Sequence, residues 1–233
     1  MRFMKTIGLL GGMSWQSTVE YYRIINEETA RRLGGLHSAK LIMSSIDFAE
    51  MEELQHTGRW TEAGELLAGQ ARGLKSAGAD FLLICANTMH KVAGAVESGA
   101  GLPVLHIADA TAGEVKKAGI KKIGLLGTRY TMEEEFYRVR LAEKHGLEVM
   151  IPPADDRLMV NRVIYDELCQ GIIRPESKAD YLRVIQNMAG DGAEGIILGC
   201  TEIELLVTPA DFPLPLFPTT RIHAEAAVDL ALA

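Results

Sequence analysis

The feature that most constrains the fold is a set of segments that recur about half a chain apart. Three pairs of segments match in the same order, at offsets of 116, 114 and 112 residues: 7–11 with 123–127, 82–88 with 196–202, and 102–103 with 214–215. Such ordered matches predict a duplicated α/β half. The alternative is that unrelated parallel strands share Ile, Leu and Gly by composition alone.

Short apolar runs alternate with amphipathic segments along both halves. This alternation is typical of parallel sheets with helices on both faces. In the first half we expect strands near 6–10, 41–46, 81–85 and 104–106. Helices are expected near 17–33, 48–55, 60–76, 108–118 and 219–232. The predicted class is α/β, with two pseudo-symmetric, doubly wound lobes and a site in the cleft between them.

The predicted domains are discontinuous. One N-terminal lobe comprises residues 1–107 plus 220–233, because the last helix leaves the second half at Pro218 and can return to the first. The second lobe comprises residues 108–219.

The composition of the chain indicates what kind of molecule it binds and in which compartment it works. The 233 residues carry 24 Lys and Arg against 31 Asp and Glu, a net charge of −7, which argues against nucleic-acid or membrane-surface binding. Three cysteines without a CxxC pair indicate a reducing compartment. The N-terminal apolar run is too short for a signal peptide. We therefore expect a cytoplasmic protein that handles small molecules.

Ligands of open parallel sheets bind at the carboxyl ends of the strands. Four predicted strand ends carry reactive or polar side chains, in the segments 11–15, 85–90, 127–131 and 199–202. Cys200 is the candidate nucleophile or base, because the start of a helix expected at 201–206 would lower its thiol pKa. The alternative is a buried, inert cysteine.

The remaining candidates are ligand-binding groups. Asn87 and Thr88 can form an anion-binding nest with backbone N–H groups, or simply cap a helix. Other candidate substrate-binding residues share a place at a strand end: Met13, Ser14, Thr128, Thr201 and Glu202. No pair of histidines has metal-ligand spacing, so no metal is expected. The Gly11-Gly12 loop lacks the third glycine of a dinucleotide fingerprint. Cys169 and His90 are interpreted as packing residues.

The motifs Cys85-Ala-Asn-Thr-Met-His90 and Gly199-Cys-Thr-Glu-Ile203 resemble those of the aspartate/glutamate racemase family, across essentially the whole chain. The resemblance implies two α/β domains enclosing an amino acid, no pyridoxal phosphate or other cofactor, and a homodimer. It further implies a cysteine from each half acting on opposite faces of the α-carbon. Asn87, Thr88 and Thr201 would hold the α-carboxylate, with Thr128 close by.

One position departs from the family pattern. The first thiol of the family immediately precedes the Asn-Thr pair, and Ala86 stands there in this chain. Cys85 is one residue earlier, and successive strand side chains point to opposite faces. The chain resembles a branch with a non-cysteine residue at this position that acts mainly on L-acidic amino acids.

The leading hypothesis is a cofactor-independent racemase of acidic amino acids that favours the L enantiomer, with Cys200 as its main base. One alternative is a single-cysteine decarboxylase or isomerase of small dicarboxylates. Another is an amino-acid-binding protein that lost catalysis with the first thiol. The residue that binds the distal group of the substrate stays open among Arg129, Tyr130 and Asp47.

Overall fold

The computed structural model describes residues 4–233, so residues 1–3 of the predicted N-terminal lobe lie outside the described part. The chain forms two compact units. Unit 1 contains Met1–His106 and His223–Ala233, and unit 2 contains Ile107–Ile222. In the described part of the chain, no helix is both long and apolar enough to cross a bilayer.

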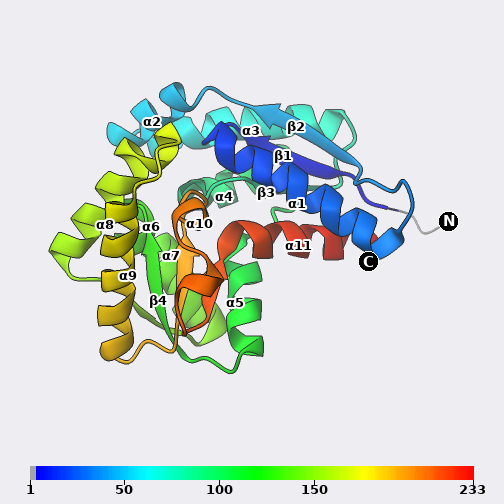
Figure 1. Ribbon diagram of the computed structural model, residues 1–233. Helices are drawn as coiled ribbons and strands as arrows, with labels where there is room; N and C mark the ends of the chain where they lie inside the picture. Colours follow the sequence, from blue (N-terminus) through cyan, green and yellow to red (C-terminus); the bar gives the residue numbers. More distant parts are fainter. Residues whose placement is uncertain (1–3) are drawn as a thin grey trace. The chain divides into compact units, whose positions relative to one another are not determined.

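Unit 1 is built on a parallel three-stranded sheet of order β2-β1-β3. Its strands and α-helices, labelled in Figure 1, are β1 (Ile7–Gly11), α1 (Trp15–Leu33), β2 (Leu41–Ser45), α2 (Phe48–His56), α3 (Trp60–Ser76), β3 (Phe81–Ile84) and α4 (Ala93–Ala100). The 3₁₀ helix η1 (Thr88–Val92) lies between β3 and α4. β1 and β3 are buried along their whole length. They therefore need apolar side chains on both faces, which explains their continuous apolar sequence.

Each face of this sheet has its own core. On one face, Ile7 and Leu9 pack with Tyr21 of α1 and with Ala224 and Val228 of the last helix. On the other face, a second cluster joins the sheet to α2, α3 and α4. The sheet is thus a middle layer between two layers of helices.

Unit 2 is built on a parallel four-stranded sheet of order β5-β4-β6-β7. Its elements are α5 (Ile107–Lys117), β4 (Lys122–Gly127), α6 (Arg129–Glu133), α7 (Glu135–Val139), the π-helical turn η2 (Arg140–Lys144), β5 (Glu148–Met150), α8 (Ala154–Asp166), η3 (Leu168–Gln170), α9 (Pro175–Gly190), β6 (Gly195–Gly199), α10 (Ile203–Leu206), η4 (Pro209–Asp211) and β7 (Leu216–Pro218). One core lies between the sheet and helices α8 and α9, which run side by side in Figure 1. The other lies between the sheet and α5.

The last helix, α11 (Thr219–Leu232), begins in unit 2 and ends in unit 1. Its four small or branched residues Ala224, Ala227, Val228 and Ala231 join the core of unit 1. The backbone N–H of Lys5 also donates to the carbonyl of Ala231 at 3.0 Å.

The two units share one topology. In each, the central strand comes first in the chain, followed by one neighbour and then the other, which gives β2-β1-β3 and β5-β4-β6. The α/β class with two parallel sheets is therefore confirmed. Two local expectations are wrong. The strand expected at 104–106 is a single bridge from Val104 to Leu82, and the helix expected at 201–206 is only Ile203–Leu206.

Candidate active site

In unit 2, the candidate residues lie at the adjacent carboxyl ends of β4 and β6. Gly127 and Gly199 are paired in the last step of the ladder. A Cβ on Gly127 would lie 2.7 Å from the carbonyl oxygen of Gly199, and a Cβ on Gly199 would lie 2.7 Å from that of Leu126. Only glycine fits at these two positions. Their close approach brings the turn at Thr128 beside the turn at Cys200.

Cys200 is tied to its own turn through a carboxylate. Its Sγ donates a hydrogen bond to Oε2 of Glu202 at 2.9 Å, and Oγ1 of Thr201 donates to the same oxygen at 2.7 Å. All three side chains are buried. One carboxylate oxygen of Glu202 therefore organises the whole strand-end turn.

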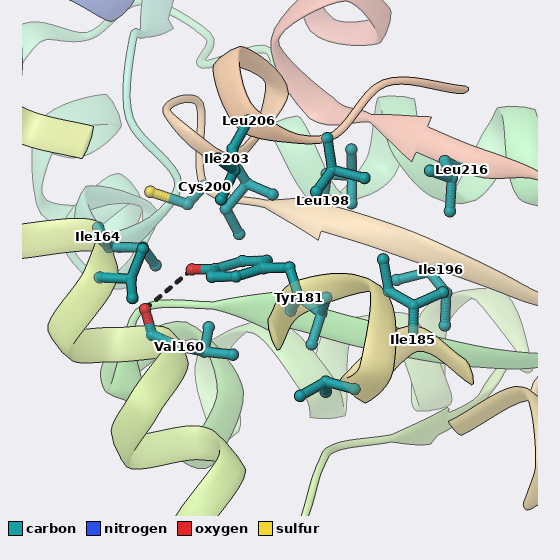
Figure 2. Close-up of a cluster of buried hydrophobic side chains, with 14 of the residues drawn as sticks. Val160, Ile164, Tyr181, Ile185, Ile196, Leu198, Cys200, Ile203, Leu206 and Leu216 are labelled. Carbon is teal, nitrogen blue, oxygen red and sulfur yellow. Dashed lines mark hydrogen bonds between the residues drawn. The ribbon is translucent and has the colours of Figure 1, made fainter. Parts of the chain in front are cut away.

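Cys200 lies at the margin of an apolar cluster. Figure 2 shows its sulfur directed away from Leu198 and Leu216, with Tyr181 below it donating to the carbonyl of Val160. The residue keeps 7% of its surface exposed. Burial raises the pKa of the Cys200 thiol well above its usual range, and the neighbouring Glu202 raises it further.

This direction corrects the expectation of a lowered thiol pKa. The helix that follows begins at Ile203 and has four residues, so its dipole is short. Desolvation and a carboxylate both favour the neutral thiol. The resting state of Cys200 is therefore the protonated one.

Cys169 is a residue whose surroundings the sequence did not reveal. It lies in the short 3₁₀ helix η3, just after α8. Burial raises the pKa of the Cys169 thiol far above its usual range, and Glu202 raises it further. Cys169 is in turn one of the groups that raise the pKa of the Cys200 thiol. No spacing in the sequence signals that the two thiols share one region.

In unit 1, the loop after β1 and the loop after β3 are joined by Ser17. Its hydroxyl lies 3.0 Å from the carbonyl oxygen of Ser14 and 3.2 Å from that of Cys85, so it can donate to either. Ser14 also caps α1, accepting from the N–H of Ser17 at 3.4 Å. Met13 and Ser14 are thereby held next to the end of β3.

Asn87 and Thr88 follow that strand end, and both are buried. The side chain of Asn87 makes no capping hydrogen bond to η1. Helix capping, the alternative for this residue, is therefore not its role here. A buried amide and a buried hydroxyl remain together at the end of β3.

The strand registers make the two turns equivalent. Leu10 pairs with Ile84 in unit 1, and Leu126 pairs with Leu198 in unit 2. Two residues further along, Ala86 occupies in unit 1 the position that Cys200 occupies in unit 2.

Comparisons with known proteins identify the family of the chain. Residues 10–227 match the family described as Asp/Glu/Hydantoin racemase. The chain belongs to this family. A proposed Asp/Glu racemase from Yersinia pestis is 58% identical, with a TM-score of 0.93, covering 99% of this chain and 100% of that one. An aspartate racemase homologue from Pyrococcus horikoshii OT3 is 34% identical, with a TM-score of 0.84, covering 98% and 99%.

More distant members share the fold. The aspartate racemase of Picrophilus torridus is 19% identical, with a TM-score of 0.76, and the alignment covers 97% of this chain and 94% of that chain. At that identity the likeness concerns the fold alone. The family resemblance expected from the two strand-end motifs is confirmed, and the chain belongs to a family of isomerases.

Within this racemase-family fold, Cys85 and Ala86 face opposite cores. Cys85 packs with the cluster that contains Tyr21, and Ala86 with the cluster that contains Met89. Burial raises the pKa of the Cys85 thiol far above its usual range. Cys85 therefore does not present a thiol where Ala86 lies.

Several other candidates have structural roles. Thr128 caps α6, accepting from the N–H of Thr131 at 3.3 Å. Asp47 caps α2. Arg129 is exposed, and Tyr130 is half-buried. Within residues 4–233, no three His, Cys, Asp or Glu side chains are grouped so as to hold a metal ion.

Proposed function

We propose that this racemase-family protein interconverts the enantiomers of an acidic amino acid without a cofactor, and that it acts preferentially on the L form. The observation that carries the proposal is the thiol of Cys200, bonded to Glu202 at the strand end where the family resemblance puts a catalytic cysteine.

The proposed chemistry begins with the weak acidity of the α-proton. Its removal leaves charge on the α-carboxylate, so the site must stabilise an enediolate with fixed donors. Asn87 and Thr88 supply an amide and a hydroxyl in unit 1, and Thr128 and Thr201 supply hydroxyls in unit 2. We propose that these four residues bind the α-carboxylate.

Cys200 must be deprotonated before it can act as a base. Glu202 is the proposed acceptor, because its Oε2 already takes the hydrogen bond of the thiol. The proton moves from Sγ to Oε2, and the resulting thiolate removes the α-proton of the L-amino acid. Glu202 therefore acts on Cys200 in this proposal, rather than binding substrate as the sequence suggested.

The other face of the α-carbon has no thiol in this chain. Ala86 stands at the position equivalent to Cys200, and a positioned acid is typically worth about 10²–10⁴-fold in rate. We therefore expect lopsided catalysis. The α-proton of the L-acid should exchange with solvent faster than the D-acid accumulates.

Proton NMR in deuterated buffer, with L- and D-aspartate and L- and D-glutamate, tests this function. Cys200→Ala should abolish exchange, whereas the matched buried-thiol variant Cys85→Ala should leave it within about twofold of wild type. The proposal fails if Cys200→Ala keeps the exchange, or if wild type exchanges both enantiomers equally fast. Release of carbon dioxide would identify a decarboxylase instead, and thermal stabilisation by ligand without exchange would identify a binding protein.

We also propose that the enzyme is a cytoplasmic homodimer. The family resemblance supports the dimer, and three free cysteines support a reducing compartment. Sedimentation equilibrium measures the oligomeric state, and a single species at the mass of one chain would contradict the homodimer. Fractionation of the native cells measures the location of the protein, and recovery of the chain outside the cytoplasmic fraction would contradict a cytoplasmic location.

A further inference from the structure

Strand β2 is an exposed edge of the sheet in unit 1. The strand order β2-β1-β3 places it beside β1, and no strand of the described residues pairs with its other side. β1 and β3 are buried throughout, whereas the residues of β2 are half-buried or exposed. An open edge of this kind presents backbone N–H and C=O groups that can pair with another chain.

The register with β1 shows which backbone groups of β2 face outward. The carbonyl of Lys40, just before β2, accepts from an N–H of β1 at 2.8 Å, and the N–H of Ile46, just after β2, donates to a carbonyl of β1 at 3.1 Å. Alternate residues of a parallel strand bond to the same neighbour, so the even-numbered residues of β2 face β1. The backbone groups of Leu41, Met43 and Ser45 therefore point toward the open edge.

The side chains of these three residues lie on the α1 side of the sheet. Leu41 packs with the core cluster that contains Tyr21 of α1, whereas Ile42 packs with the cluster that contains α3. Successive side chains alternate between the two faces of a strand. Met43 therefore lies on the same face as Leu41, and it is 46% exposed there.

Helix α1 extends this exposed apolar surface. Trp15, Val19 and Tyr22 are four and three residues apart, so they form a stripe along one side of the helix. Asn26 continues the stripe, and its side-chain amide donates to the carbonyl of Tyr22 at 2.8 Å. Oδ1 of Asn26 accepts from the backbone N–H of Ala39 at 3.0 Å, two residues before β2. The stripe therefore runs along the side of α1 that faces the edge strand.

The exposed apolar side chains of α1 and β2 together form what we call the edge patch, Trp15, Val19, Tyr22 and Met43. Their exposed fractions are 64%, 51%, 52% and 46%. Since a large side chain has about 150–250 Å² of surface, the edge patch exposes roughly 400 Å². This is about half of the ~800 Å² that each partner buries in a stable interface. A contiguous apolar patch of this size is typical of an interaction surface.

Antiparallel pairing of β2 with a second copy of itself would satisfy the open edge. A two-fold axis at Met43 sets Met43 opposite its own counterpart, and Leu41 opposite Ser45 of the partner subunit. The outward backbone groups belong to these residues, so each opposed pair exchanges two hydrogen bonds. The flanking charges also match, because Lys40 precedes β2 and Asp47 follows it. Antiparallel pairing brings the lysine of each copy to the aspartate end of the other.

We propose that two copies of this chain associate through β2, with the two-fold axis at Met43. The pairing joins their three-stranded sheets into one, and the two edge patches pack together beside the junction. This inference goes beyond racemisation. It rests on the homodimer of the proposed function and names the surface that forms it. Every residue that it uses belongs to unit 1.

Cysteine cross-linking tests the register of the pairing. Opposed hydrogen-bonded residues of antiparallel strands have Cα atoms about 5.5 Å apart, which a disulfide can span. Met43→Cys should therefore form a disulfide-linked dimer when diamide accepts the two electrons and two protons of the thiols. Ser45→Cys is the matched control, because its two copies would lie more than about 13 Å apart. On non-reducing gels we expect at least tenfold more cross-linked dimer for Met43→Cys.

Sedimentation equilibrium tests the surface without a cross-link. Met43→Lys places two like charges on the axis, and it should raise the dissociation constant of the dimer by at least about 30-fold. Leu158→Lys is the control, since Leu158 of α8 in unit 2 is 61% exposed and lies outside the edge patch. It should leave the dissociation constant within about twofold of wild type.

Three results would each overturn the proposed pairing. They are an unchanged dissociation constant in Met43→Lys, equal cross-linking of Met43→Cys and Ser45→Cys, and a monomeric wild type. The first two would exclude this surface while the homodimer stands, whereas the third would end both proposals. The racemase proposal is decided separately, by α-proton exchange in Cys200→Ala.

Discussion

The hydrogen bond from Cys200 to Glu202 affects the thiol in two opposite ways. Burial and the neighbouring carboxylate both keep Cys200 protonated. The same carboxylate also accepts the hydrogen bond of the thiol and can therefore accept its proton. Sequence reasoning predicted that Cys200 follows a strand end, which is confirmed, but it predicted the wrong direction for the pKa of the thiol. The apolar surroundings that raise the pKa come from α8 and α9, and only tertiary packing brings these helices to Cys200.

Glu202→Gln tests both roles of the carboxylate at once. Removing its charge should lower the pKa of the Cys200 thiol, since Glu202 is one of the causes that raise it. Iodoacetamide should then alkylate Cys200 faster at a given pH, as followed by mass spectrometry of the Cys200 peptide. L-acid exchange should nonetheless fall by about 10²-fold or more, because the proton acceptor is lost. Faster alkylation with undiminished exchange would exclude Glu202 as that acceptor.

At the scale of elements, the ends of β4 and β6 approach so closely that their last residues must be glycine. A methyl group on Gly199 would lie 2.7 Å from the carbonyl oxygen of Leu126 and 2.9 Å from Cδ1 of Leu125. Because one of these neighbours is backbone and the other is a buried core side chain, neither can move away easily to accept a methyl group at position 199. The repeated Gly-Leu-Leu-Gly motif in the sequence predicted the strand, but not that its final glycine brings Thr128 beside Cys200.

Gly199→Ala should therefore cost about 1–3 kcal/mol of unfolding free energy and displace Cys200 enough to slow exchange. Gly113→Ala in α5 is the matched control, since its Cβ would meet no atom within 4 Å. As a helical substitution it should stabilise by about 0.5–1 kcal/mol. Urea unfolding measures the unfolding free energies of Gly199→Ala and Gly113→Ala. Equal values for the two variants would refute the close approach of the strand ends at Gly199.

The junction of α10 and α11 carries a carboxyl group that titrates near neutral pH. Oε1 of Glu204 accepts from the backbone N–H of Thr220 at 2.8 Å. Burial raises the pKa of Glu204 from 4.5 to about 7. A carboxyl group with a raised folded-state pKa contributes stability that is fully present below pH 4.5 and is lost as the pH rises through 7.

Wild type should thus lose about 3 kcal/mol of stability from this group between pH 4.5 and pH 8. Glu204→Gln keeps an acceptor for Thr220 and removes the titration. The difference in unfolding free energy between wild type and Glu204→Gln, measured in urea at pH 5 and pH 8, should shift in favour of the variant at the higher pH. A pH-independent difference would show that Glu204 does not titrate in this range.

At the scale of the whole molecule, the internal repeat explains how much could be predicted. Apolar runs such as 7–11 and 123–127 recur because each is the central strand of a sheet, so the α/β class and the two parallel sheets could be predicted from them. The packing of His90 against His106 and His223 could not be predicted, because His223 is brought there by a helix that returns from the end of the chain. Cys169 was missed for the same reason, since only tertiary packing brings η3 near α10.

The equivalence of the two halves yields a prediction about the missing thiol. Ala86 and Cys200 follow matching register pairs in the two sheets, and Ala86 is 7% exposed, as Cys200 is. A cysteine at position 86 should therefore take the equivalent place in unit 1 and add the acid and base that the proposed mechanism lacks on its second face. Ala86→Cys should raise D-to-L turnover by up to about 10²–10⁴-fold and narrow the gap between L exchange and D-acid accumulation. Circular dichroism of D- and L-aspartate and D- and L-glutamate reactions measures both directions, with Ala86→Ser as the control for added size. A turnover that rises equally in both variants would mean that space or polarity, and not the thiol, limits the second face.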